Sequence, residues 1–291
     1  NKNNNANLSI LAVTGYALAP TFNSGIYDYE VTVEATKEKL SPNEVTAISE
    51  DSNATIAKQE EITLSTTQDN YYTVTITAED GQTTKTYTIK VIRPKSNDAS
   101  LKEVKLTGAT LSPSFVSNKY EYTITVPYGS NDFSIEGVPT INKTTVSGNG
   151  NYHLSDNKVT LTSTAEDGTI LNYHFTVVEA LSKDATLSNL SVTGYPLDKA
   201  FVQTTLDYSL GDLPYGTTKL KINATPNNNL STIEYYVDGV KQNSNIVSIP
   251  NVMGNKVITV VVTAADGIAN KTYNISYNII PSSNNYLISL R

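Results

Sequence analysis

The stretch LSILAVTGYALAPTFNSGIYDYEVTV, residues 8–33, contains a pattern of residues that occurs three times in this chain. The second copy spans residues 101–126 and the third begins at residue 187. In every copy a Gly stands seven positions after the opening Leu, and a Phe stands seven positions after that Gly. An alternating segment starts five positions after the Phe. Spacing this regular predicts an array of tandem repeats.

The alternating segment is predicted to be a β-strand. In residues 27–33 apolar side chains occupy every second position, and residues 120–126 repeat the pattern. A period of two places one set of side chains on one face of a strand. We expect this face to line a core, and we expect Phe22, Phe115 and Phe201 to plug the cores of their repeats.

Each copy closes with a second shared block, in which two alternating segments are joined by Asp-Gly. Gly supplies the positive φ that a tight turn between antiparallel strands needs. The sequence therefore predicts three closing hairpins. In the second copy Ser163 stands where the others have Ile76 and Val262. The three turns are Ala78-Glu79-Asp80-Gly81, Ala165-Glu166-Asp167-Gly168 and Ala264-Ala265-Asp266-Gly267.

The repeats divide the chain into predicted domains at 1–94, 95–181 and 182–281. Domains of about 90 residues are long enough to bury their own cores. A further Leu-x-x-Leu within residues 282–291 predicts the start of a truncated fourth repeat. The connecting segments are short, polar and poor in Gly, so we expect limited hinge motion and an elongated array.

Composition excludes several classes of function. The chain of 291 residues has a net charge of −7, a pI of about 4.9 and no Cys. An acidic chain without a basic run is a poor partner for nucleic acid or for an anionic membrane. No segment approaches the ~20 apolar residues of a membrane span, so no membrane insertion is expected. The absence of Cys excludes disulfides, catalytic thiols and thiolate-bound metals, and no cofactor is predicted.

The repeated motifs resemble the cadherin-like β-sandwich repeat of bacterial cell-surface and secreted proteins. That family opens with Leu-x-x-Leu and a Gly, and continues with Leu-x-Pro-x-Phe and Tyr-x-x-x-Val. It ends with Ala-x-Asp-Gly before a Thr-Tyr strand. The resemblance covers nearly the whole chain. The matching residues include Pro20 and Phe22, Pro113 and Phe115, and the block Ala78-Glu79-Asp80-Gly81 with Thr86-Tyr87.

The resemblance implies three tandem immunoglobulin-like antiparallel β-sandwiches in an elongated array. It also implies an extracellular location, at the cell surface of a mostly Gram-positive group of bacteria or in a secreted protein. Members of the family are non-catalytic and serve as spacers or adhesive modules. The expected partners are the neighbouring domains of a longer chain, and the expected state is a monomer.

The third copy departs from the family pattern at two positions. Lys199 stands where the Pro is expected, and Asp212 stands at the position of Val33. The early strands of this copy are therefore predicted to be shifted.

No constellation of an enzyme is visible in the sequence. A glycosidase needs two carboxylates that face each other across a cleft, about 5–10 Å apart. The neighbouring acids of the Glu-Asp-Gly turns point apart, and Ala265 replaces one of them in the third copy. The two histidines, His153 and His174, fall on polar strand positions without a nucleophile or a metal-binding spacing. No catalytic residue and no metal ligand is predicted.

Calcium between the domains is one alternative, because Asp98 and Asp184 lie at the joints. Calcium takes six to eight oxygen ligands, usually from several convergent carboxylates. Neither Asp-x-Asp nor Asp-Arg-Glu occurs near these joints. The sequence therefore favours capping or solvated loop acids.

A binding module is the second functional hypothesis. The chain has 19 Tyr and no Trp, and several Tyr do not fit a core strand. Exposed aromatic rings stack on sugars or anchor protein interfaces. The predicted ligand-binding residues are Tyr235, Tyr236, Tyr195 and Tyr215 of the third copy, and the predicted ligand is a glycan or a host surface protein.

Overall fold

The structure is a computed structural model that describes residues 2–281. The described residues form β-strands and two short 3-10 turns, without an α-helix. In this part of the chain no helix is long and apolar enough to cross a membrane. The all-β fold is as predicted. The proposed fourth repeat, at residues 282–291, lies outside the described residues.

The chain divides into two compact units, residues 1–124 with 133–176 and residues 125–132 with 177–291. The first unit contains the first repeat and most of the second, and the other unit contains the third repeat. Every described sheet stays within one repeat. The exact domain boundaries stay predictions.

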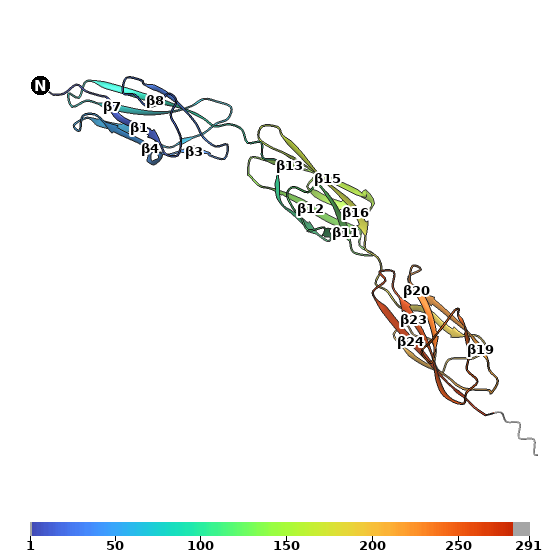
Figure 1. Cartoon of the computed structure of the whole chain (residues 1–291). Helices are drawn as coiled ribbons and strands as arrows, with labels where there is room; N and C mark the ends of the chain where they lie inside the picture. The colour runs from blue at the N-terminus through green and yellow to red at the C-terminus, as the bar shows by residue number, and fades with distance from the viewer. Residues whose placement is uncertain (1, 282–291) are drawn as a thin grey trace, which may run out of the picture. The chain divides into compact units, whose positions relative to one another are not determined.

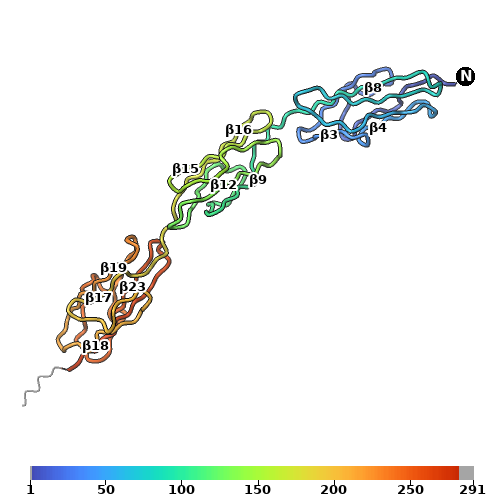
Figure 2. Tube along the Cα trace, turned by 180° about the vertical axis from the view of Figure 1, so that it is seen from behind, coloured from blue at the N-terminus to red at the C-terminus, as the bar shows by residue number. Residues whose placement is uncertain are grey.

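The first repeat is a sandwich of short strands. β2, β8, β7 and β5 form one sheet in that order, and the pairs β1–β4 and β3–β6 lie opposite. Figure 2 shows β8 in one layer of this repeat and β3 and β4 in the other. The strands are β1 (Leu8–Val13), β2 (Asp28–Thr32), β3 (Lys39–Leu40), β4 (Val45–Ser49), β5 (Thr55–Lys58), β6 (Ile62–Thr63), β7 (Asn70–Thr77) and β8 (Thr84–Ile92), with a 3-10 turn at Pro42–Glu44.

Alternation along the strands builds the core as predicted. Tyr29 and Val31 of β2 are buried, and so are Val74 and Ile76 of β7, while the residues between them face outward or are half-buried. The turn between β7 and β8 contains Gly81 at φ +71°, which gives the predicted closing hairpin.

One kind of pairing, found in the first and third repeats, departs from the antiparallel expectation. β2 runs parallel to β8, with Tyr29 opposite Ile89 and Val31 opposite Val91. In the third repeat β18 (Asp207–Leu213) likewise runs parallel to β24 (Asn270–Ile279). Parallel neighbours need a long crossover connection. Here the strands between β2 and β8 supply that crossover, so the parallel pair closes the sheet edge without a tight turn.

Two buried tyrosines hold the segment between β1 and β2 in place. The hydroxyl of Tyr29 accepts the N–H of Asn23 at 3.1 Å and donates to the Asn23 carbonyl at 2.7 Å. The hydroxyl of Tyr87 accepts the N–H of Leu8 at 3.1 Å and donates to the Ser24 carbonyl at 2.8 Å. Because each hydroxyl satisfies backbone groups that would otherwise be buried without partners, these tyrosines are structural.

The same tyrosine bonds recur in the other repeats. Tyr122 and Tyr208 bond the backbone six residues upstream, as Tyr29 does. Tyr173 accepts the N–H of Leu101, and Tyr273 accepts the N–H of Leu187. The repeated sequence motif thus encodes a repeated hydrogen-bond pattern.

The three motif phenylalanines lie over these tyrosines. The Phe22 ring centroid is 5.9 Å from that of Tyr29 and 6.2 Å from that of Tyr87. Phe115 and Phe201 pack on the equivalent pairs. Each Phe is half-buried rather than fully enclosed. The phenylalanines therefore cover one side of the aromatic cluster and do not plug the centre of the core, which corrects the prediction.

The second repeat has the same two-layer plan (Figure 1). One sheet has the order β10-β11-β16-β15-β13 and the other has the order β14-β12-β9. Tyr122 and Phe175 stack in its core at a centroid distance of 5.6 Å. The strands are β9 (Leu101–Thr107), β10 (Thr110–Ser112), β11 (Glu121–Val126), β12 (Asp132–Pro139), β13 (Thr145–Ser147), β14 (Gly150–His153), β15 (Lys158–Thr164) and β16 (Ile170–Glu179), with a 3-10 turn at Leu154–Asp156.

The third repeat shows the predicted shift. The pairing of β18 with β24 is irregular between Ser209 and Asp212, and Leu213 rather than Asp212 is buried. One extra residue moves the acid out of the core, as a β-bulge does. The remaining strands are β17 (Leu187–Val192), β19 (Lys219–Pro226), β20 (Thr232–Val237), β21 (Val240–Gln242), β22 (Ile246–Ser248) and β23 (Gly254–Thr263).

Candidate functional site

The four tyrosines predicted to bind a ligand lie in different surroundings. Tyr235 and Tyr195 are half-buried and pack against the core of the third repeat. Tyr236 is half-buried, and its hydroxyl donates to Glu234 Oε2 at 2.7 Å. Tyr215 lies in the loop after β18 and is 50% exposed. Tyr215 is thus the ring of this group with the largest free surface.

These tyrosines come from three places in the repeat. Tyr235 and Tyr236 belong to the β18-β24-β23-β20-β21 sheet, while Tyr195 bridges to Val192 beside the other sheet. In the described part of the chain no ring contact joins any two of the four. A common aromatic platform is not formed by their packing, and their role in binding stays a prediction.

The carboxylates of the closing turns act on the backbone. Asp80 Oδ1 accepts the N–H groups of Gln82 and Thr83, both at 2.8 Å. These bonds hold the pKa of the Asp80 carboxyl below its usual value, because they stabilise the charged form. Asp266 likewise accepts two backbone N–H groups, and Asp167 accepts that of Thr169, and these bonds lower the pKa of both carboxyls. Each acid is a turn acceptor within its own repeat.

The turns also bind the segment that enters their repeat. The N–H of Asp80 donates to the Asn3 carbonyl at 3.0 Å. The N–H of Asp167 donates to Ser96, and that of Asp266 to Ser182, in the same way. The turn therefore anchors the connecting segment of each repeat.

Glu166 lies in a closing turn, as predicted from the sequence, but its contact with the preceding repeat was missed. Its carboxylate binds Arg93 through two bonds of 3.0 and 3.1 Å, and it also accepts the N–H of Ser96 and the hydroxyl of Thr66. The Arg93 guanidinium holds the pKa of the Glu166 carboxyl below its usual value. One signal in the sequence could have indicated this contact. Arg93 and Glu166 occur together at the first joint, and both are absent from the corresponding positions of the second joint.

The joint acids cap turns. Asp98 Oδ1 accepts the N–H of Ser100 at 2.8 Å, and Asp184 Oδ1 accepts the N–H of Thr186 at 2.8 Å. Within residues 2–281 no cluster of three or more His, Cys, Asp or Glu residues is arranged to hold a metal ion. Capping accounts for both acids.

Tyr16 lies beside a carboxylate and an ammonium group in the first repeat. Its hydroxyl donates to Glu34, and the ammonium of Lys37 lies 5.8 Å from the ring centroid. Burial and the Glu34 carboxylate raise the pKa of Tyr16 to about 12. A hydroxyl with this pKa stays protonated at neutral pH, so it serves as a hydrogen-bond donor and not as a base.

His174 is exposed on β16, and its ring Nδ1 is 3.1 Å from the hydroxyl of Thr160 on the neighbouring strand. This is a cross-strand surface contact. His153 is likewise exposed, and its backbone N–H donates to Asp156.

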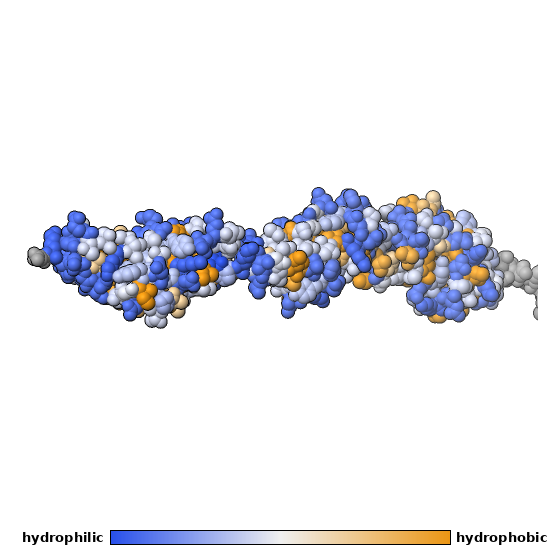
Figure 3. All heavy atoms as spheres, turned by 90° about the horizontal axis from the view of Figure 1, so that it is seen from above, coloured by the Kyte–Doolittle hydropathy of each residue, from blue (hydrophilic) through white to orange (hydrophobic). Residues whose placement is uncertain are grey.

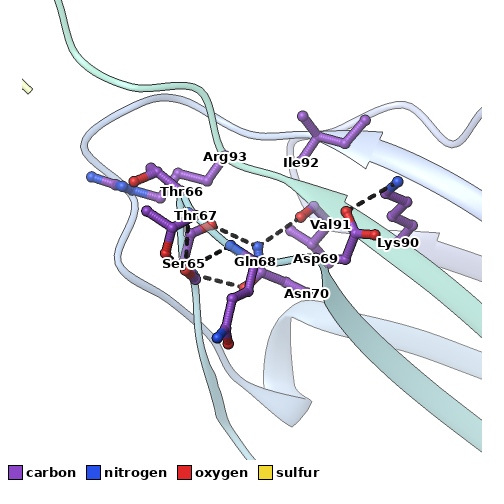
Figure 4. A pocket seen from close by; sticks show the side chains of 10 residues that line it. All are labelled: Ser65, Thr66, Thr67, Gln68, Asp69, Asn70, Lys90, Val91, Ile92 and Arg93. Atoms are coloured by element: carbon purple, nitrogen blue, oxygen red, sulfur yellow. Dashed lines mark hydrogen bonds and ion pairs between the residues drawn. The ribbon is translucent and has the colours of Figure 1, made fainter. Parts of the chain in front are cut away.

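A polar pocket of about 400 Å³ lies beside the end of β8. The loop of residues 65–70 and the residues from Lys90 to Arg93 line it. Figure 4 shows Arg93 reaching toward Thr66 at one end of this pocket, while Lys90 lies at the other end. The Asn70 amide fills the middle, where it bonds the backbone of Ser65 and Val91. Internal bonds thus occupy much of the polar lining.

The face of the molecule drawn in Figure 3 is mainly polar. On the face drawn in Figure 3, polar and weakly polar side chains cover most of the area, with smaller apolar areas between them. Half-exposed or more exposed apolar side chains of the third repeat include Leu230, Val240, Val252 and Met253.

Comparison with known structures identifies cell-surface ectodomains at low similarity. Drosophila N-cadherin EC1-3 is 9% identical, has a TM-score of 0.28, and matches over 86% of this chain and 97% of its own. Drosophila OTK extracellular domains 3-5 are 8% identical, with a TM-score of 0.30 and coverage of 87% and 94%. The protocadherin GammaB4 extracellular domain is 10% identical, with a TM-score of 0.26; the match covers 91% of this chain and 49% of that one. At these values none of the likenesses carries an argument about function.

Comparison with protein families identifies the family of the chain. No curated protein sequence matches the chain. The model of the cadherin-like beta sandwich domain matches residues 6–94 and 187–278, which together exceed half of the chain. Between these matches the second repeat has the same tyrosine bonds and closing turn. From the shared motifs, the sheets and this match, we conclude that the chain belongs to the cadherin-like beta sandwich domain family.

Proposed function

We propose that the chain is a non-catalytic structural and adhesive module, a stalk or spacer in an extracellular bacterial protein of the cell surface or in a secreted protein. The observation that supports this proposal most is that the polar groups which recur at the same positions in each repeat bind the backbone. The tyrosine hydroxyls and the turn carboxylates of the repeats bond the backbone. They build the sandwiches and anchor their entering segments.

The spacer function is tested by height above a surface. The chain is tethered at its C-terminal end to a supported bilayer, and a fluorophore at its N-terminal end reports the height by metal-induced energy transfer. The fluorophore of the full chain is expected to stand higher than that of a chain reduced to the third repeat. Equal heights would refute the spacer proposal.

Absence of catalysis is tested separately. The purified chain is incubated with panels of polysaccharides, peptides and esters, and product formation is followed by mass spectrometry. No turnover is expected. Turnover that a single point substitution abolishes would contradict the proposal.

Binding of a glycan or host protein by the third repeat is a second candidate. The half-exposed ring of Tyr215, in a loop after β18, favours it. The full chain, Tyr215→Ala and the double variant Tyr235→Ala/Tyr236→Ala are applied to a glycan array and to immobilised host surface proteins. Binding that Tyr215→Ala removes would support this site, while binding that survives both variants would reject it.

A further inference from the structure

The carboxylate of Glu166 gathers donors from two repeats. Arg93, which follows β8, donates from Nη1 to Oε1 at 3.0 Å and from Nη2 to Oε2 at 3.1 Å. The Thr66 hydroxyl donates to Oε1 at 3.2 Å, and the Ser96 N–H donates to Oε2 at 3.2 Å. All four residues belong to one compact unit of the chain. Arg93 and Thr66 lie at the same end of the pocket in Figure 4.

This ion pair differs from an ordinary surface pair. The side chain of Arg93 is 3% exposed and that of Glu166 is 16% exposed. Two parallel bonds between a guanidinium and a carboxylate fix the orientation of both planes. Removal of one partner leaves the other charge buried and uncompensated, which is strongly unfavourable. Arg93 Nε is buried without a hydrogen-bond partner, so the two bonds to Glu166 come from the terminal nitrogens of the guanidinium.

The other repeats provide an internal comparison. Glu79 occupies the turn position of Glu166 in the first repeat, and there it accepts the N–H of Asn3 in an exposed setting. In the third repeat Ala265 occupies that position. The residue of the second repeat that corresponds to Arg93 is Glu179, which accepts the N–H of Gly129 at 2.8 Å. Both members of the pair are therefore absent from the equivalent positions of the second joint.

We propose that the C-terminal end of the first repeat is an interaction surface that selects its neighbour through the Arg93–Glu166 pair. Its partner is a repeat whose closing turn begins Ala-Glu-Asp-Gly. The second repeat meets this requirement. The third repeat does not, because Ala265 leaves the buried guanidinium without a carboxylate. The end of the first repeat therefore fits a repeat with Glu at this turn position, such as the second, and does not fit the third, a property that goes beyond a general spacer function.

A second contact at this joint is weaker. Glu38 lies 3.3 Å from the Asn142 amide and 3.4 Å from the Lys143 ammonium, and these groups are exposed. Solvent screens such pairs, and they contribute little. We therefore assign the selection to Arg93 and Glu166.

The test measures the distance between the two repeats in the full chain. The chain has no native Cys, so Thr63→Cys and Thr145→Cys carry unique spin labels on the outer faces of β6 and β13. Double electron–electron resonance gives the distribution of label distances. The width is compared between the parent chain, Glu166→Ala, Arg93→Met and the double variant. Glu166→Ala reproduces the turn of the third repeat, and Arg93→Met keeps the apolar stem of the side chain.

Each single variant is expected to broaden the distribution. The double variant should broaden it no further, because both changes remove one shared interaction. The matched control is Glu79→Ala, which deletes the same side chain from the same turn of the first repeat and should leave the width unchanged. Circular dichroism verifies folding, and Glu166→Gln, which can still accept the Ser96 N–H, replaces Glu166→Ala if that variant unfolds.

Two results would overturn the proposal. One is a distribution as narrow in the Arg93 and Glu166 variants as in the parent chain. The other is equal broadening by Glu79→Ala, which would show a general effect of the turn acids. Broadening confined to the Arg93 and Glu166 variants supports the pair as the selecting contact.

Discussion

Ser163 and Tyr277 are buried side chains whose oxygens have no hydrogen-bond partner. Both stand where other repeats carry apolar residues. Ile76 and Val262 correspond to Ser163, and Val91 corresponds to Tyr277. A buried hydroxyl without a partner costs about 1–3 kcal/mol. At these two positions the repeat family tolerates a local penalty that its other copies avoid.

Ser163→Ala is expected to stabilise the second repeat by about 1 kcal/mol, because it removes an unsatisfied hydroxyl without adding volume. Hydrogen exchange of residues 158–179 in the full chain, followed against denaturant, measures the change. Lower stability would show that the hydroxyl has a partner, such as a buried water.

Tyr277 and Tyr273 should respond to the same substitution with opposite sign. Tyr273→Phe leaves the buried N–H of Leu187 without its acceptor and is expected to destabilise the third repeat by about 1–3 kcal/mol. Tyr277→Phe removes only an unpaired hydroxyl and is expected to stabilise it at pH 7. Urea unfolding of the full chain, resolved by hydrogen exchange of β23 and β24, measures both. Equal signs would contradict the bonding described for the two tyrosines.

The stability of the third repeat is also expected to depend on pH through Tyr277. Burial, with a smaller contribution from Asp238, raises the pKa of Tyr277 to about 12. The unfolded chain has a tyrosine pKa of about 10, so the folded state disfavours the charged form. The neutral hydroxyl of Tyr277 therefore contributes fully to the stability of the folded state below pH 10. The free energy of unfolding falls by up to about 3 kcal/mol as the pH rises toward 12. Tyr277→Phe should flatten the alkaline loss of stability of the third repeat, and an unchanged profile would refute the assignment.

At the scale of elements, the segment between the first two strands depends on aromatic packing. Phe115 lies over Tyr122 and Tyr173, with centroid distances of 5.6 and 5.8 Å. Because the ring is half-buried, Phe115→Ala should cost about 2–3 kcal/mol, less than the 3–5 kcal/mol of a fully buried ring. Thermal unfolding of the full chain measures the loss in the second repeat. The neighbouring exposed residue supplies the control, Val116→Ala, and equal effects of the two variants would place Phe115 outside the cluster.

At the scale of the whole molecule, the prediction concerns the radius of gyration of the chain. A compact body of this length would have a radius of gyration of about 19 Å, and one repeat about 12 Å. Three such repeats in a line would give roughly 29 Å. We expect small-angle scattering in dilute solution to yield a radius of gyration of roughly 29 Å or more. The reason is that the joints are short and poor in Gly. A value near 19 Å would favour a cluster of sandwiches and would remove the basis of a spacer.

The amino-acid sequence by itself determined the strands, the closing turns and the repeat period. These features are local, because alternation sets which face of a strand is buried and Asp-Gly sets where the chain reverses. It also indicated the irregular strand near Asp212, since an acid at a core position must be displaced. All of this follows from residues that are close in the chain.

Only the tertiary structure decided how distant residues meet. Tyr87 bonds Leu8 across 79 positions, and Glu166 meets Arg93 across 73. Alternation predicts that a tyrosine faces inward, but the partner of its hydroxyl depends on the register between separate strands. The parallel pairing of β2 with β8 and the half-burial of Phe22 likewise depend on the path of the whole repeat. Charges at a joint look like solvated loop residues until the fold brings them together and excludes water, and that desolvation gives the Arg93–Glu166 pair its specificity.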